Sequence, residues 1–390
     1  MAKAKASKKK AKTAAGKVKK VVRAKPRNKP QNAPTLESQV TSLDRQLLKL
    51  VQDRAKLVQK MAKRQDSAVE LHLAASLDEQ ALSSLVERSR GPLPRRTVRA
   101  IFGELASGCR SLVRELRIAF LGPQHSYSHL AAMHRFGQSV EFVPVGSIPA
   151  VFEEVNRGHS DFGIVPVENS TDGRIADTLD MFTRLPVRIC GEVEIEIHHT
   201  LLGKCPRREV REVYSRPQAL SQCRNWLAKH LPAARTIEVT STSTAAQLAK
   251  EKPGAAAIAS LQAGVHYALD ILAEQIEDNP SNTTRFAVIG DESSPPTGND
   301  RTAILFQVEH RPGALAEAMN VFKRNRLNLT WIESFPIPGV KRGYLFFVEL
   351  EGHEQDLRIR RAIATLGSKA LRLEILGSFP ASSVAEQTES

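Results

Sequence analysis

The sequence predicts a multidomain protein with an all-α N-terminal module, a two-lobed α/β middle part and a smaller α+β module at the C-terminal end. Three observations predict this fold class. Residues 35–115 carry apolar side chains at helical spacing, strand and helix patterns alternate through residues 116–298, and residues 301–378 follow a βαββαβ order. A chain of 390 residues is long enough for two or three domains.

The composition is typical of a globular protein, with 41% hydrophobic and 25% charged residues. No apolar run approaches the roughly 20 residues of a membrane span, and the N-terminal residues lack the apolar core of a secretory signal. The four cysteines match neither a zinc nor a CxxC spacing, so we interpret them as reduced thiols. We therefore expect a cytoplasmic protein that contacts no membrane and holds no metal.

The net charge of +14 is concentrated in the first 34 residues, which contain 13 Lys or Arg and no acidic residue. The other 356 residues carry 43 basic against 42 acidic side chains. Because an Ala/Lys-rich segment with several prolines cannot form a core, we interpret residues 1–34 as a disordered tail, and residues 379–390 as a second one. The alternative for the basic tail is weak, salt-dependent binding of nucleic acid through phosphates.

A long helix begins the helical module, and one apolar seam runs along it. The seam is formed by Leu36, Val40, Leu43, Leu47, Leu50, Leu57 and Met61. Arg54 occupies the remaining seam position, where a guanidinium needs an acidic side chain or an anionic ligand as its partner. Further helices are predicted at about 77–90 and 96–114, on either side of the Gly91–Pro94 break.

The middle part contains two polar segments at the ends of apolar strands. Glu168-Asn169-Ser170 ends the strand predicted at 161–167, and Asn282-Thr283-Thr284-Arg285-Phe286 opens the strand that continues to residue 289. Ligands of open α/β sheets bind beyond strand ends, and a guanidinium beside hydroxyl donors suits a substrate that carries carboxylates. Capping of ordinary strand ends is the alternative for each segment taken alone. Further strands are predicted at 117–121, 141–145, 193–197, 212–215, 237–240 and 255–259.

Six segments of the middle part resemble, in their order, a prephenate dehydratase domain. These segments are Leu121–Ser128, Pro166–Ser170, His199–Leu201, Tyr214–Cys223, Ser243–Ala246 and Asn282–Phe286. The resemblance implies a two-lobed, periplasmic-binding-protein-like domain over residues 116–298. It also implies conversion of prephenate to phenylpyruvate with loss of carbon dioxide and water, in L-phenylalanine biosynthesis. Since aromatisation drives this reaction, the resemblance implies no cofactor.

The resemblance also implies roles for single residues. Thr284 is expected to donate a hydrogen bond to the departing hydroxyl, and Arg285 to hold or orient the substrate, so that both converge on one cleft. Asn169 and Glu168 complete the catalytic set. The substrate-binding set comprises Ser126, Ser170, Thr200, Ser215, Gln222, Ser243, Thr244 and Phe286. Helix capping is the alternative for Ser126, Thr200, Ser243 and Thr244.

The helical module resembles an AroQ-type chorismate mutase domain through Leu43–Leu48, Arg54 and Gly91–Pro94. Glu37 stands where the first helix of this family, which holds the two carboxylates of chorismate with several cations, has an arginine, and Gln65 stands where a lysine ends that helix. Ala74 and Leu77 align roughly with an Asp and an Arg that the family has in its second helix. Since one cation cannot hold a dianion well, we expect a structural or dimerising module in which Arg54 is a remnant and mutase activity is doubtful. A fully bifunctional enzyme is the alternative.

The C-terminal module resembles the ACT domain, a ferredoxin-like regulatory module. The resemblance implies L-phenylalanine as an allosteric effector and a homodimer or homotetramer. Its effector-binding residues are Gly313, Ala314, Leu315, Asn328, Leu329, Glu333 and Ser334. Phe335 stands where the family usually has arginine. A module that only dimerises is the alternative.

Two departures and one further function class remain. His125 stands where the dehydratase family usually has glycine, and Arg216 stands where histidine is frequent. The pair His198-His199 suggests a metal site, but adjacent strand residues point to opposite faces. A non-catalytic sensor of small ligands, which signals through the basic tail, is the alternative to an enzyme.

Overall fold

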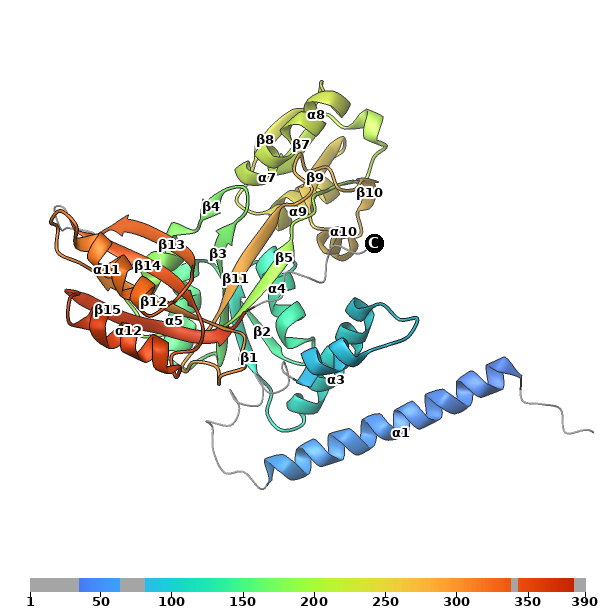
Figure 1. Cartoon of the computed structure of the whole chain (residues 1–390). Coiled ribbons are helices and arrows are strands. Elements are labelled where there is room, and N and C mark those ends of the chain that lie inside the picture. The colour runs from blue at the N-terminus through green and yellow to red at the C-terminus, as the bar shows by residue number, and fades with distance from the viewer. Residues whose placement is uncertain (1–34, 64–80, 338–342, 382–390) are drawn as a thin grey trace, which may run out of the picture. The chain divides into compact units, whose positions relative to one another are not determined.

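The structure is a computed structural model that describes residues 35–63, 81–337 and 343–381 (Figure 1). Two compact units, Met1–Leu50 and Val51–Ser390, divide the chain. The predicted N-terminal tail lies outside the described residues, as do residues 382–390 of the predicted C-terminal tail. The boundary of the second tail at residue 379 is wrong, because Phe379 and Pro380 belong to the last strand and Phe379 is buried. Within those ranges, no helix combines the length and the apolar composition needed to cross a membrane.

The predicted helices of the N-terminal part are present where the structure describes them. Helix α1 spans Leu36–Ala62, and its apolar seam is exposed from Leu36 to Met61. Residues 81–88 are helical, and α3 (Arg95–Ser111) follows Pro94. Glu37 lies in the first turn of α1, where a carboxylate favours the positive end of the helix dipole.

The first α/β sheet has six strands in the order β2-β1-β3-β11-β5, with β4 paired to β3. These strands are β1 (Arg117–Leu121), β2 (Glu141–Val145), β3 (Phe162–Asn169), β4 (Gly173–Arg174), β5 (Arg188–Glu196) and β11 (Thr283–Gly290). The helices α4 (Tyr127–Phe136), α5 (Ile148–Asn156) and α6 (Ala176–Phe182) pack against it. Strands β1, β2 and β3 are parallel, whereas β11 runs antiparallel to both β3 and β5.

The second sheet lies in the chain between β5 and β11 and has the order β10-β6-β9-β7-β8. Its strands are β6 (Thr200–Gly203), β7 (Glu212–Ser215), β8 (Arg235–Glu238), β9 (Ala255–Ala259) and β10 (Asp270–Ala273). The helical elements η1 (Arg207–Glu209), α7 (Pro217–Gln222), α8 (Arg224–His230), α9 (Thr242–Glu251) and α10 (Leu261–Tyr267) accompany it. The chain thus leaves the first sheet after β5 and returns through β11, which gives the predicted two α/β lobes.

The third sheet has the order β13-β14-β12-β15 and the predicted βαββαβ succession. Its elements are β12 (Asp300–Gln307), α11 (Ala314–Arg324), β13 (Leu329–Pro336), β14 (Tyr344–Glu351), α12 (Leu357–Gly367) and β15 (Arg372–Pro380). One face packs on its two helices through Phe306, Phe322 and Val348. The opposite face, with Leu305 and Phe347, shares a hydrophobic core with the first sheet.

Candidate active site

The two polar segments that the sequence singles out lie side by side on neighbouring strands. In the antiparallel pair of β3 and β11, Thr284 is opposite Asn169 and Arg285 is opposite Glu168. Strand β3 ends at Asn169, and β11 begins at Thr283, so both segments lie at the same end of the first sheet. Their polar side chains therefore meet where the apolar strands stop.

The buried amide of Asn169 orients the hydroxyl of Thr284. Asn169 Nδ2 lies 2.8 Å from Thr284 Oγ1 and 3.0 Å from Asn282 Oδ1, and it donates to both. Asn169 Oδ1 accepts from the backbone amides of Thr171 and Asp172, at 2.9 and 3.0 Å, which fixes the orientation of the side-chain amide. Because Thr284 Oγ1 accepts from Asn169, its own proton points away from Asn169.

Gln222, at the end of α7, connects the second lobe to this group. Its Oε1 lies 2.8 Å from His199 Nε2 and accepts from Asn282 Nδ2 at 3.2 Å. Its Nε2 donates to Asp172 Oδ2 at 3.2 Å. Burial lowers the pKa of His199 more than the hydrogen bond to Gln222 raises it, so the ring is neutral. A neutral ring that donates from Nε2 keeps Nδ1 as an acceptor. Tyr127 Oη lies 3.5 Å from Nδ1, but it donates its proton to the carbonyl of His198 at 2.6 Å.

Ser170 joins the same cluster, whereas other predicted contact residues have structural partners. Ser170 Oγ lies 3.3 Å from Asn282 Oδ1 and accepts from the amide of Thr283 at 2.9 Å. Ser215 is buried, and its hydroxyl donates to the carbonyl of Ile258 on the next strand. Phe286 is part of the hydrophobic core.

Ser126 caps the N-terminus of α4, as the capping alternative predicts. Its hydroxyl oxygen accepts from the amide of His129 at the start of α4. The backbone amide of Thr244 is capped by Ser241, and Ser243 Oγ donates to the carbonyl of Gln124 in the first-lobe turn. Thr200 is buried at the start of β6.

The expectation that Arg285 and Thr284 converge on one cleft is wrong. Successive residues of a strand face opposite sides of the sheet. The guanidinium of Arg285 makes two hydrogen bonds, of 2.7 and 3.0 Å, to the carboxylate of Glu349 in β14, and it lies over the ring of Trp331 at 4.7 Å. Glu168 lies on this side as well, 3.8 Å from Arg285 Nε.

Burial and charge oppose each other in the Arg285–Glu349 pair. Burial lowers the pKa of Arg285, but Glu349 and Glu192 outweigh it and hold the pKa above its ordinary value. Burial raises the pKa of Glu349, and Glu192 adds to this increase, while Arg285 opposes it. We consider the pair ionised, because the two-point geometry is that of a charge-assisted contact.

The paired histidines have separate partners. His198 Nδ1 lies 2.8 Å from Glu277 Oε1, whereas His199 contacts Gln222. Among the residues that the structure describes, no group of three or more His, Cys, Asp or Glu is arranged to hold a metal. Sequence reasoning did not assign His199 and Asp172 to the site. His199 belongs to one of the six recognised segments, and Asp172 lies three residues after Asn169. Their closeness in sequence to predicted site residues is the signal that could have assigned them to the site.

Two family models match the chain. The prephenate dehydratase model matches residues 118–294, and the chorismate mutase type II model matches residues 36–114. A bifunctional chorismate mutase/prephenate dehydratase of Stutzerimonas stutzeri is 39% identical over 354 residues, which cover 88% of this chain and 96% of that protein.

Two solved structures are similar to about two thirds of the chain. A prephenate dehydratase from Arthrobacter aurescens in complex with L-Phe has a TM-score of 0.64 at 31% identity, covering 68% of this chain and 90% of that chain. GqqA, described as a novel type of quorum quenching acylase, has a TM-score of 0.63 at 28% identity, covering 68% of this chain and 98% of that chain.

The expectation of doubtful mutase activity is wrong. The mutase model covers the whole helical module, and a relative matched over nearly its full length is bifunctional. The charge argument considered only four positions of the module, and three of these, Gln65, Ala74 and Leu77, lie outside the described residues. Helix α1 carries other cations besides Arg54, namely Arg45, Lys49, Lys56 and Lys60. The chain belongs to the family of bifunctional chorismate mutase/prephenate dehydratases.

Proposed function

We propose that the chain catalyses both reactions of its family, the mutase reaction on chorismate in the helical module and the decarboxylating dehydration of prephenate in the two α/β lobes. The hydroxyl of Thr284, held by Asn169 with its proton available, is the observation that supports the dehydratase site most directly. Gln222, Asn282 and Ser170 are hydrogen-bonded to one another beside Asn169, and they add amide and hydroxyl groups to this end of the sheet.

In the proposed dehydration, the bond between the ring and its carboxylate breaks, and its electron pair enters the ring. The carboxylate leaves as carbon dioxide, and the ring carbon opposite it loses its hydroxyl, which takes up a proton from solvent and leaves as water. Thr284 donates a hydrogen bond to the departing oxygen, which is the poorer of the two leaving groups. Asn169 keeps the Thr284 oxygen in place during this step, because the Asn169 amide is itself fixed by two backbone donors.

The test compares Thr284→Ala with Thr284→Ser by ultraviolet detection of phenylpyruvate. General acid assistance contributes roughly a hundredfold or more, so Thr284→Ala should lose about that factor in kcat, whereas Thr284→Ser keeps the hydroxyl and most of the activity. A urea unfolding transition of the same samples is the control for folding. Wild-type turnover by Thr284→Ala would contradict the proposed role.

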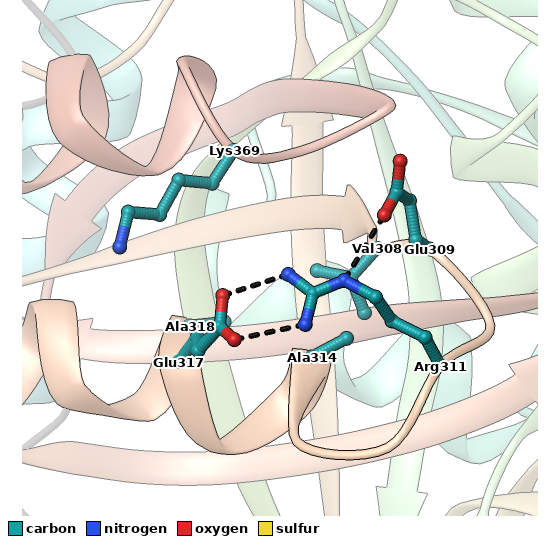
Figure 2. A pocket seen from close by; sticks show the side chains of 7 residues that line it. All are labelled: Val308, Glu309, Arg311, Ala314, Glu317, Ala318 and Lys369. Atoms are coloured by element: carbon teal, nitrogen blue, oxygen red, sulfur yellow. Dashed lines mark hydrogen bonds and ion pairs between the residues drawn. The ribbon is translucent and has the colours of Figure 1, made fainter.

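We also propose that the C-terminal module is an ACT domain that binds L-phenylalanine and regulates the dehydratase. Its βαββαβ order and its likeness to the Arthrobacter aurescens prephenate dehydratase, whose structure is a complex with L-Phe, support this proposal. A small pocket lies beside Gly313-Ala314-Leu315, and its lining residues are Val308, Glu309, Arg311, Ala314, Glu317, Ala318 and Lys369 (Figure 2). Arg311 binds Glu317 and Glu309 there, so its charge is already compensated within the chain.

Regulation is tested by measuring phenylpyruvate formation at increasing L-phenylalanine while chorismate consumption is followed in parallel. Inhibition of the dehydratase supports an effector role for L-phenylalanine. Unchanged rates of phenylpyruvate formation would contradict this role and favour the alternative that the C-terminal module only dimerises. Light scattering of the full chain tests the proposed homodimer or homotetramer. The exposed apolar seam of α1 supports self-association, because a row of leucines is stabilised when it is covered.

A further inference from the structure

The C-terminal module contacts the strand that carries Thr284 through a buried ion pair. Arg285 follows Thr284 in β11, and Glu349 lies in β14 of the third sheet. Glu349 is almost completely buried, with 3% of its side chain exposed, and its two oxygens bind the two terminal nitrogens of Arg285 at 2.7 and 3.0 Å. A contact at two points fixes the orientation of a guanidinium as well as its distance.

The alternation of side chains along both strands places this pair in the interface between the modules. Ala287 and Ile289 follow Arg285 on one face of β11 and belong to the core shared with the third sheet. Phe286, on the face of Thr284, belongs to the separate core beneath α4. On β14, Phe347 lies on the same face as Glu349 and enters the shared core. The ion pair is therefore continuous with the apolar interface.

Further charges hold the pair in place. Glu192 of β5 lies 3.9 Å from Arg285 and 3.3 Å from Arg301 of β12, and only 4% of its side chain is exposed. Two buried carboxylates thus face two guanidinium groups. Displacing β11 from the third sheet would separate these charges in a medium of low dielectric constant, which is strongly unfavourable.

A second contact reaches the other side of Asn169. Arg174 of β4 donates to the Glu333 carboxylate at 3.0 Å and to the Ser334 carbonyl at 2.7 Å, both in β13. In the sheet, Glu168 is opposite Arg174 on β4 and opposite Arg285 on β11. The C-terminal module therefore binds both strands that flank the end of β3.

We propose that Glu349 is a positioning residue for the dehydratase reaction. Through Arg285 it fixes the start of β11, so that the hydroxyl of Thr284 keeps its place against Asn169. This proposal rests on the proposed role of Thr284. It assigns to Arg285 a contact within the protein instead of a contact with substrate, and it makes the C-terminal module part of the structure that supports turnover in the absence of any effector.

The first experiment measures kcat and KM of Glu349→Gln in the full chain without L-phenylalanine. The amide removes one negative charge from the cluster and a strong acceptor from Arg285. We expect kcat to fall about ten- to a hundredfold, the effect of a small displacement of a reacting group, with KM changed much less. Glu351→Gln is the matched control, because this exposed carboxylate on the same strand binds only Asn328 in the part of the chain that the structure describes, and we expect unchanged kcat.

Two further variants keep the test decisive. Arg285→Lys preserves every charge but removes the two-point contact, so it should fold and still lose kcat. In a Thr284→Ala background, Glu349→Gln should cause no further loss, because the group that it positions is gone. Wild-type kcat in folded Arg285→Lys, or an undiminished effect of Glu349→Gln in that background, would overturn the proposal. A Thr284→Ala enzyme of wild-type activity would instead contradict the proposed role of Thr284. A wild-type urea unfolding transition identifies folded samples.

Discussion

Asn169 and Thr284, which are 115 residues apart in the sequence, are joined by a hydrogen bond of 2.8 Å between the ends of β3 and β11. The direction of this bond matters more than its length. The amide nitrogen of Asn169 has only protons to offer, so the Thr284 oxygen is the acceptor and its own proton remains for a ligand. A side chain at position 169 that accepts instead of donating would reverse this arrangement.

Asn169→Asp is therefore expected to lose most dehydratase activity, by roughly a hundredfold in kcat. A carboxylate would accept a hydrogen bond from the Thr284 hydroxyl, whose proton would then not be offered to a ligand. It would also lie against Asn282 Oδ1, the acceptor that Asn169 Nδ2 contacts at 3.0 Å, with no proton to donate to it. Steady-state formation of phenylpyruvate measures the effect, and a urea unfolding transition shows whether the variant is folded. Wild-type kcat in Asn169→Asp would show that the direction of this hydrogen bond is unimportant.

The pairing of these two segments could be predicted in part from the sequence. Polar residues at the ends of two apolar strands indicated a common site, and the order of the recognised segments indicated two lobes. The register could not be predicted, because β11 reaches β3 only after the chain has formed the second lobe. A shift of one residue exchanges the faces of a strand, so the local sequence did not show which face Arg285 takes. That Arg285 and Thr284 face opposite sides follows from their adjacency in one predicted strand, and the expectation that they converge overlooked this alternation.

The partners of Arg285 and Gln222 could not be predicted from the sequence either, because they lie far away in the chain. Glu349 lies in another module, and its burial in β14 is decided by the packing of two sheets against each other. Asp172 meets Gln222 only because the end of α7 is brought to the loop after β3. The short strand β10 was not predicted, since Asp270 and Ile271 are exposed and carry no alternating pattern.

Stability should fall in mild acid because of His129. Burial lowers the pKa of His129 from 6.5 to about 4, and His125 adds to this effect. The folded pKa lies below the unfolded one, so the unfolded chain binds the proton more tightly. The contribution of His129 is therefore fully present above pH 6.5 and is lost as the pH falls toward 4, by roughly 2 to 3 kcal/mol.

Urea unfolding at several pH values measures this loss, and His129→Gln should reduce its slope between pH 6.5 and 4. His125 contributes to the same range, because burial and His266 lower its pKa as well, so the slope is reduced and not abolished. An identical slope in wild type and His129→Gln would show that His129 is not the group responsible.

His125 itself adopts a backbone conformation that suits glycine. Its φ is +64°, in the left-handed region, and its ring contacts His266 of the second lobe at 4.2 Å between centroids. In His125→Gly the relieved strain and the greater freedom of the unfolded chain nearly offset each other, so we expect a change within about 1 kcal/mol. His125→Val, with a branched side chain at positive φ, should be less stable by a further 1 to 2 kcal/mol, roughly.

Urea titration of both variants at pH 7.5, where His125 and His129 are neutral, separates the backbone effect from titration. The carbonyl of His125 accepts from Ser260 and its amide donates to His129, so both contacts persist in either variant. Equal stability of the glycine and valine variants would refute backbone strain at this turn.

Gln222 offers a test by exchange of partners. In Gln222→Glu, the new carboxylate still accepts from His199 Nε2 and Asn282 Nδ2, but it faces the Asp172 carboxylate across the present 3.2 Å contact. This like-charge contact should displace the end of α7 and lower kcat/KM of the dehydratase by about tenfold or more.

The double variant Gln222→Glu/Asp172→Asn restores a donor and an acceptor with their places exchanged, and it should recover most of the loss. Asp172→Asn alone is the matched control, because an asparagine at that place can rotate to present its oxygen to Gln222 Nε2, which predicts a small effect. The coupling between the two positions is read from the four values of kcat/KM. Equal activity of Gln222→Glu and the double variant would mean that the two side chains act independently and that their contact does not position the end of α7 against the loop after β3.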